Sequence, residues 1–241
     1  MISKKKKFIA IIPARSGSKG LKNKNILNVS GHPLISYSIQ AAKESKFINK
    51  IFVTTDGEKI AKISKSYGAE VIKRPKKLSG DKLGIELVVV HAVGEIEKRI
   101  NFIFDNIVLL QPTSPLRSAK DIDRAISIFI KKKSDSLFSS VNLHPLFWTK
   151  KNTYMPTNYN VNKRPNRQQM DETLIENGSI YISKKKIYKN KNNRLGGKIS
   201  TYTMKNFSVF EVDSKEDLDL MSILIPSKKL KKIICKPKKI L

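Results

Sequence analysis

The sequence predicts an α/β fold, in which a mostly parallel central sheet is covered by helices on both faces. Two observations lead to this prediction. Short apolar runs of strand length alternate with segments whose apolar residues recur at helical spacing. The first of these runs ends directly in a polar loop that contains glycine, where α/β sheets bind their ligands. At 241 residues the chain is long enough for one large domain with a buried core.

The first half of the chain supplies the alternating order of strands and helices. The run 8–12 is apolar throughout, so we expect a fully buried strand there. Further strands are expected at 51–53, 69–72, 107–110 and 136–141. Helices are expected after Pro33, from about residue 60 to Gly68, over 84–99 and over 121–130. Such alternation is typical of a parallel sheet with helices on both faces.

The pattern changes after Val141. Residues 143–176 are rich in Asn, Pro, Arg and Gln and show little periodicity, which predicts an arm inserted into a single domain spanning 1–225. Strands are expected at 178–183, 199–204 and 207–210, and a closing helix at 215–225. The Lys-rich residues 226–241 are expected to form a frayed basic tail.

The loop Pro13–Asn25 is the first candidate for a functional site. It follows the first strand and is dense in Gly, Ser, Lys and Asn. Gly17 and Gly20 would let backbone N–H groups approach an anion closely, and Arg15, Lys19, Lys22 and Lys24 supply positive charge. Neither the dinucleotide pattern GxGxxG nor the P-loop pattern GxxxxGK[ST] is present. We therefore predict a triphosphate-binding loop of another kind, the alternative being a solvated basic loop.

The charge balance permits polyanionic partners. Lys and Arg number 48 against 20 Asp and Glu, a formal net charge of +28. This favours nucleic acid, anionic membrane surfaces or phosphorylated ligands. The lysines are spread along the chain and are not interleaved with aromatic residues, which argues against nucleic acid.

The remaining composition indicates a cytoplasmic protein. The single cysteine, Cys235, excludes an internal disulfide and suits a reducing compartment. The sequence shows neither a membrane span nor a signal peptide, so we expect no membrane partner.

Four stretches together resemble the acylneuraminate cytidylyltransferases, the CMP–sialic acid synthetases of bacteria. They read IPARSGSKG at 12–20, LLQPTSPLR at 109–117, NGSIYI at 177–182 and EVDSKED at 211–217. The resemblance covers about residues 7–222. It implies a Rossmann-like nucleotidyltransferase fold. It also implies a reaction in which CTP and a nine-carbon 2-keto sugar acid give the CMP-sugar and pyrophosphate.

The resemblance assigns residues to the nucleotide. Arg15 and Lys24 would screen the triphosphate and take part in catalysis, and Gln111 would lie near the nucleotide and the sugar acid. The full set expected to bind the nucleotide is Ala14, Arg15, Ser18, Lys19, Gly20, Lys24, Asn25, Arg74, Asp81 and Gln111.

The resemblance also implies a metal ion. Mg²⁺, with Mn²⁺ as an alternative, would be bound by Asp213 as the catalytic ligand together with Glu211. Relatives generally carry Asp at both positions, so Glu211 is a departure, although its longer side chain could reach the metal directly or through water. We expect both carboxylates on one side of a strand end.

For the sugar acid, the resemblance implies binding by Gln111, Arg167, Gln168, Asn177 and Tyr181, with the guanidinium on the carboxylate. The sequence departs from the family on this side at Asp171, at 82–84 and at Phe147. These departures leave N-acetylneuraminic and legionaminic types of acid both open. Enzymes for 3-deoxy-manno-octulosonate or pseudaminate, and a basic nucleic-acid-binding protein, are the alternatives.

Residues 143–166 occupy the place of the family's dimerisation arm, which implies a homodimer whose arms help to complete the partner's site. Phe147 and Trp148 could anchor that interface or pack in the core. The three histidines have no metal-binding spacing and are interpreted as structural.

Overall fold

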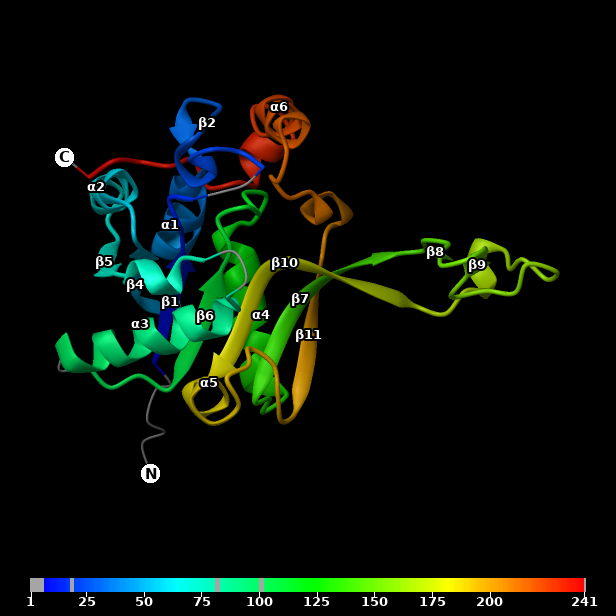
Figure 1. The fold of residues 1–241 in the computed structure, drawn as a ribbon, viewed down its shortest axis with the longest axis horizontal. Helices are drawn as coiled ribbons and strands as arrows, with labels where there is room; N and C mark the ends of the chain where they lie inside the picture. The colour runs from blue at the N-terminus through cyan, green and yellow to red at the C-terminus, as the bar shows by residue number, and fades with distance from the viewer. Residues whose placement is uncertain (1–6, 18–19, 81–82, 100–101, 241) are drawn as a thin grey trace.

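The computed structural model describes residues 7–17, 20–80, 83–99 and 102–240, and its main feature is a seven-stranded sheet (Figure 1). The strand order is β11-β7-β10-β6-β1-β4-β5, and β10 runs antiparallel to both of its neighbours, so the sheet is mostly parallel. The strands are β1 Phe8–Pro13, β4 Ile48–Thr55, β5 Glu70–Lys73, β6 Asn106–Leu110, β7 Ser136–Leu143, β10 Thr173–Lys184 and β11 Ile199–Met204.

Helices cover both faces of the sheet, as the sequence predicts. Side chains of α1, α2 and α4 share one hydrophobic cluster with Ala10 and Ile12 of β1, and those of α3 and α5 share another with Ile9 and Ile11. These four β1 side chains are fully buried, which explains the unbroken apolar run. The helices are α1 Leu34–Glu44, α2 Glu58–Ser66, α3 Ile85–Arg99, α4 Ala119–Lys131, α5 Lys185–Lys191 and α6 Lys215–Leu224.

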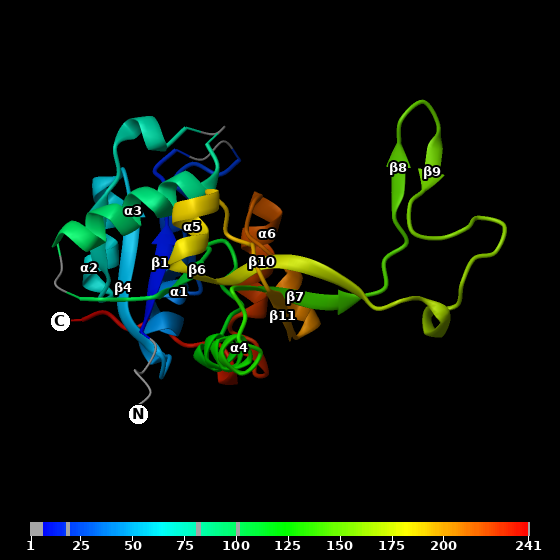
Figure 2. The same cartoon turned by 90° about the horizontal axis from the view of Figure 1, so that it is seen from below.

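The irregular region predicted at 143–176 forms a projecting arm. Strands β7 and β10 continue past the sheet, and beyond them lies a hairpin of β8 (Trp148–Lys150) and β9 (Tyr154–Pro156). Figures 1 and 2 show this arm extending away from the rest of the molecule. Its last residues, from Thr173, belong to the long strand β10 rather than to an insertion.

Two expectations were wrong. Residues 207–210 do not form a strand, since Asn206–Val209 is a short 3-10 helix. Phe207 and Val209 alternate in sequence, but they pack against two different hydrophobic clusters instead of one face of a sheet. A second short strand pair, β2 (Asn28–Val29) with β3 (His32–Pro33), was not expected.

The second wrong expectation concerns residues 226–241, because the described part of this segment, through Ile240, is packed rather than frayed. Leu230 and Ile234 are buried against α1 and α6, and the Ile240 N–H donates to the Ser66 carbonyl at 2.7 Å. Figure 1 shows the segment in red, running from α6 to the end of α2. In the described part of the chain, no helix is long and apolar enough to cross a membrane.

Candidate functional site

A cavity of about 460 Å³ lies at the carboxyl ends of β1 and β6, and we call it the strand-end cavity. This is where a ligand is expected in an α/β sheet. Seven of the sequence-predicted residues line it: Arg15, Gly20, Lys24, Asn25, Arg74, Gln111 and Asp213.

The loop after β1 is held in place by neighbouring strands. The Ala14 N–H donates to the Thr54 carbonyl, so this part of the loop continues the pairing of β1 with β4. Ser16 donates to Asp56 twice, through its N–H at 2.9 Å and its hydroxyl at 2.7 Å. Burial raises the pKa of Asp56, but hydrogen bonds, the largest of them from Ser16, together with the charge of Arg74 lower the net pKa. Asp56 is therefore an ionised anchor for the loop.

Asn25 and Gly20 shape the loop from inside. The buried Asn25 donates its amide to the Arg15 carbonyl at 3.0 Å, which fixes the backbone beside Arg15. A Cβ on Gly20 would lie 2.8 Å from the Asp213 carbonyl oxygen, too close for any side chain to fit without a shift. Gly20 thus allows the first loop to approach the segment that carries Asp213.

That approach brings a lysine and a carboxylate together. The ammonium of Lys24 lies 2.7 Å from Asp213 Oδ1, although the two residues are far apart in the sequence. The Lys24 side chain is 17% exposed and that of Asp213 is 69% exposed. The carboxylate is therefore oriented by Lys24 and still open to the cavity.

Arg74 is the most unusual group in the wall of the cavity. It is only 7% exposed, yet its Nε and Nη2 form no hydrogen bond with any described residue. The nearest carboxylate, that of Asp56, is 3.6 Å away from Nη2. Burial lowers the pKa of Arg74 and Asp56 opposes this, while the charge of Arg15 lowers the pKa further. A buried donor without a partner costs about 1–3 kcal/mol, so a ligand that accepts from Arg74 would recover that free energy.

Gln111 follows β6 and faces the same cavity. Its Nε2 donates to the Gly178 carbonyl at 3.0 Å, which leaves its Oε1 as an acceptor. This amide orientation is the one that the hydrogen bond favours.

Glu211 lies behind the cavity rather than in its lining. It accepts from the Ser114 hydroxyl at 2.9 Å, and a Cβ on Gly178 would overlap its carboxylate. Burial raises the pKa of Glu211, and the nearby charge of Asp213 raises it further, although the Ser114 bond opposes them. Residues 210–213 are not a strand, so the two carboxylates do not share a strand face as expected; the residue between them, Val212, is buried.

The residues expected to bind the sugar acid are not brought together in one chain. Arg167 and Gln168 are exposed in a short 3-10 helix of the arm, away from the strand-end cavity. Asn177 is buried and bonds to Ser139 and Ser208 on the α4 side of the sheet. Tyr181 packs on the α3 side, where its hydroxyl donates to Glu176. Asn177 and Tyr181 therefore do not line one pocket, which corrects that expectation.

The structure also adds lining residues that the sequence did not indicate. Leu78, Leu83, Ile85 and Val88 form an apolar wall of the strand-end cavity. The closely spaced Gly80 and Gly84 beside this wall were the available signal for a shaped loop. Ser18, Lys19 and Asp81, also predicted to bind nucleotide, lie outside the described residues.

A metal ion would find few protein ligands here. No group of three or more His, Cys, Asp or Glu able to hold a metal occurs among the described residues. Asp213 nevertheless offers an open carboxylate, and Glu211 lies close behind it. One or two carboxylates completed by substrate phosphates and water are the usual ligands of Mg²⁺, so the donor set fits that ion.

Comparison with known proteins identifies the family. The family model described as cytidylyltransferase matches residues 9–240, nearly the whole chain. The chain belongs to the cytidylyltransferase family. This confirms the resemblance drawn from the four sequence stretches.

Curated relatives within this family fall into two lengths. An N-acylneuraminate cytidylyltransferase of Escherichia coli is 34% identical over 231 residues, covering 92% of this chain and 53% of the relative. The post-translational flagellin modification protein B of Campylobacter coli is 33% identical, covering 92% of this chain and 97% of the relative. The chain thus spans about half the length of the N-acylneuraminate cytidylyltransferases that it matches.

A solved structure supports the fold. The chain superposes with a TM-score of 0.70 on a CMP:2-keto-3-deoxy-manno-octonic acid synthetase complexed with CTP, at 15% identity, covering 91% of this chain and 98% of the other. The cytidylyltransferase-family sheet seen here is therefore the Rossmann-like nucleotidyltransferase fold that the sequence predicted.

Proposed function

We propose that this protein is a cytidylyltransferase that activates a nine-carbon 2-keto sugar acid, of the N-acetylneuraminate or legionaminate type, with CTP. The anomeric hydroxyl oxygen of the acid forms a bond to the α-phosphorus of CTP. The bond from that phosphorus to the bridging oxygen breaks, pyrophosphate leaves, and the hydroxyl proton is released. The relatives named N-acylneuraminate cytidylyltransferase support this substrate class. CTP and the single cysteine favour a cytoplasmic location.

The observation that carries this proposal is the set of cations around the strand-end cavity. Arg15, Lys24 and Arg74 line it together with one exposed carboxylate, Asp213. A triphosphate gives the buried Arg74 guanidinium the acceptors that it lacks. Charge neutralisation and in-line positioning are what phosphoryl-type transfer requires most from a protein.

Two features prepare the cavity for the nucleoside. Gln111 presents its Oε1 because its Nε2 is already bonded to Gly178, and the exocyclic amine of cytosine is a donor that this oxygen accepts. The apolar wall formed by Leu78, Leu83 and Val88 offers a surface on which the base and ribose can pack.

Mg²⁺ is the cofactor that we propose, with Mn²⁺ as its substitute. Asp213 would hold it, and Glu211 would support it from behind. The ion supplies charge neutralisation on the transferring phosphate when bound. Lys24 keeps the Asp213 carboxylate oriented toward the cavity before substrate arrives.

We further propose a homodimer in which each arm reaches the partner's site. On the hairpin, the side chain of Tyr154 is 67% exposed and that of Met155 is 59% exposed. Neighbouring exposed apolar side chains of this kind are typical of a surface that contacts another protein. Arg167 and Gln168 lie on the same arm and are separated from their own cavity. Exchange of arms would place this guanidinium at a partner's cavity, where it can bind the carboxylate of the acid.

The test is pyrophosphate release with CTP and Mg²⁺. N-acetylneuraminic, legionaminic, pseudaminic and 3-deoxy-manno-octulosonic acids are offered side by side. We expect release with one of the first two, and its loss in Arg15→Ala but not in Lys22→Ala. Lys22 is the matched control because it is exposed on the same loop and does not line the cavity.

Each other outcome contradicts part of the proposal. Release only with pseudaminic or octulosonic acid would overturn the substrate class. No pyrophosphate release with any of the four acids, from a protein that also does not bind CTP, would overturn the proposed reaction. Equal activity of the two loop variants would remove Arg15 from its role.

A further inference from the structure

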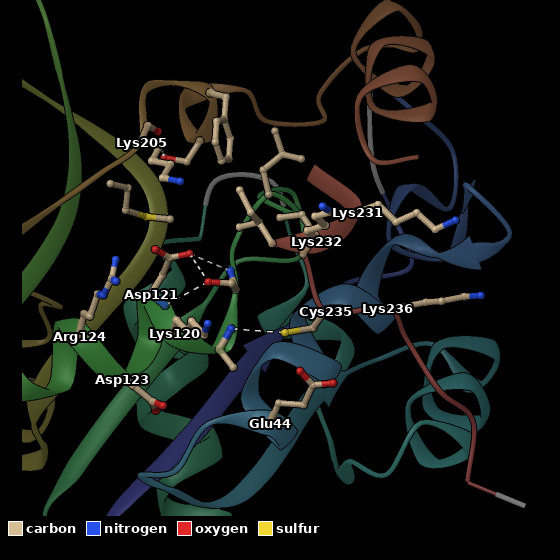
Figure 3. A pocket seen from close by; sticks show the side chains of 18 of the residues that line it. Glu44, Lys120, Asp121, Asp123, Arg124, Lys205, Lys231, Lys232, Cys235 and Lys236 are labelled. Carbon is tan, nitrogen blue, oxygen red and sulfur yellow. Dashed lines mark hydrogen bonds between the residues drawn. The ribbon is translucent and has the colours of Figure 1, made fainter. Parts of the chain in front are cut away.

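A second cavity, of about 650 Å³, lies between the start of α4, the segment 204–208 and the C-terminal segment 231–238 (Figure 3). We call it the tail cavity. It shares no lining residue with the strand-end cavity. Its volume is within the range of small-molecule sites, about 300–1,000 Å³.

The charge of the tail cavity is strongly positive. Eight basic and three acidic side chains line it. Among the described residues, none of the lysines in the lining forms an ion pair; five of these are labelled in Figure 3, namely Lys120, Lys205, Lys231, Lys232 and Lys236. These five lysines come from three separate segments, namely the start of α4, residues 204–208 and residues 231–238, which meet only in the fold.

The three carboxylates are occupied by other donors. Asp121 accepts from Ser118 and, through its other oxygen, from the Tyr202 hydroxyl at 2.8 Å. Asp123 accepts from the Ser45 hydroxyl at 2.6 Å, and Glu44 accepts from Gln40. These hydrogen bonds come from Ser, Tyr and Gln donors and not from the lysines of the cavity. The lysines can therefore pair with an external anion.

Part of the lining of the tail cavity is apolar, and we call this part the floor. It includes Leu116, Met204, Phe207 and Ile234, and the buried thiol of Cys235 accepts the Ala119 N–H at 3.4 Å. A ligand suited to this cavity therefore combines an uncharged, flat or apolar part with several negative charges. Phosphate groups match clustered lysines, and a base with its ribose matches the floor.

Two loops join this cavity to the strand-end cavity. One carries Gln111 at its beginning, in the strand-end cavity, and Leu116 at its end, in the tail cavity. The other carries Phe207 in the tail cavity and Asp213 in the strand-end cavity. The two loops are joined by the Val212 N–H, which donates to the Thr113 carbonyl at 2.8 Å.

We propose that the tail cavity is a second binding site, for a nucleoside di- or triphosphate, and that its occupancy orders the two loops that carry Gln111 and Asp213. The site is regulatory rather than catalytic. It lies outside the reaction proposed above, and it would exist whichever sugar acid is the substrate.

The test uses isothermal titration calorimetry of the full chain with CTP. We expect two sites per chain. Lys120→Gln combined with Lys232→Gln should weaken one of them about tenfold, the size expected for removing two partly exposed charges. Arg15→Ala should weaken only the other. The matched control combines Lys228→Gln with Lys229→Gln, which removes the same charge from a part of the C-terminal segment outside the cavity and should change neither site.

Three results would overturn the inference. They are a single CTP site that responds to Arg15→Ala alone, equal weakening by the cavity pair and the control pair, and equal binding of cytidine, which lacks phosphate. The coupling has its own test in Arg15→Ala, where CTP should slow amide hydrogen exchange over 111–116. Unchanged exchange would overturn it. If CTP binds only at the site that the Lys120→Gln and Lys232→Gln pair weakens, the proposed reaction is wrong and the inference of a binding site in the tail cavity still holds.

Discussion

Two lysine–aspartate pairs of the same length lie at opposite ends of the central sheet. Lys24 is 2.7 Å from Asp213 at the carboxyl ends of the parallel strands, and Lys184 is 2.7 Å from Asp135 at their amino ends. Distance alone would give them the same role. Their surroundings differ, because the Asp213 side chain is 69% exposed and that of Asp135 is 23% exposed.

The pair at the amino ends is completed by the protein itself. Asp135 also accepts the Lys198 N–H at 3.0 Å and has Lys186 at 3.6 Å. The hydrogen bond from Lys184 is the largest of the effects that lower the pKa of Asp135 to about 2. At the carboxyl ends, by contrast, Asp213 stays open, and Nε and Nη2 of Arg74 form no hydrogen bond with any described residue. A ligand site therefore differs from a structural ion pair in that some of its charged groups still lack hydrogen-bond partners within the protein.

The largest effect is expected from Asp213→Ala. Turnover with Mg²⁺ should fall by about 100-fold or more, since the oriented carboxylate of the cavity is lost, while the urea midpoint changes little. Steady-state kinetics and urea unfolding measure the two quantities. Asp135→Ala is the control and should reverse the result, with lower stability and retained turnover. If both variants behaved alike, the two pairs would not differ in role.

Arg74→Met should separate activity from stability. We expect kcat/KM with CTP to fall by about 100-fold, because one charged donor to the phosphates is removed. The free energy of unfolding should change little, because the loss of the ion pair with Asp56 is offset by the replacement of a buried guanidinium, two of whose nitrogens form no hydrogen bond, with an apolar side chain. Lys184→Met, at the other end, should lose stability only. A less stable Arg74→Met protein would show that Arg74 is a structural residue.

Gly20→Ala tests the contact between the first loop and Asp213. The added Cβ would meet the Asp213 carbonyl oxygen at 2.8 Å, so the loop must move, and we expect a loss of about tenfold in turnover. Gly17→Ala is the matched control in the same loop, because a Cβ there meets nothing within 4 Å. Similar kinetics for the two variants would contradict the close approach.

The smallest effect is a pH dependence at the amino ends of the strands. The lowered pKa of Asp135 stabilises the fold above the unfolded-state value of about 4. This contribution is lost as the pH falls toward about 2. Asp135→Asn should therefore be less stable than the wild type at pH 7, and the difference in urea midpoint should shrink below pH 4. A difference that does not depend on pH would contradict the ion pair.

The sequence was most informative where the type of each residue follows from a single structural requirement, such as burial. The run 8–12 is apolar because both faces of β1 are buried, so strand, loop and cavity could be placed from it. The missing hydrogen bonds at Nε and Nη2 of Arg74 could not be predicted, because they depend on where Asp56 lies in space.

Two other features were hidden from the sequence for physical reasons. Asn177 and Tyr181 are four residues apart, so in a regular strand their side chains would face the same side of the sheet. Here the pairing of β10 with β7 shifts register between Glu176 and Tyr181, and Gly178 has a positive φ. The two side chains are therefore on opposite faces. In the C-terminal segment, the apolar Leu230 and Ile234 stand among lysines, and the composition suggested a solvated tail.

The packed C-terminal segment has a consequence for how the chain is made. Leu230 and Ile234 cover apolar side chains of α1 and α6, and the Ile240 N–H bonds to the end of α2, a helix from the first third of the chain. During synthesis α1 and α2 emerge long before the residues that cover them, whereas α6 emerges just before them. The nascent chain therefore exposes apolar surface until residues 226–240 leave the ribosome, and chaperones have their longest access to it at that stage.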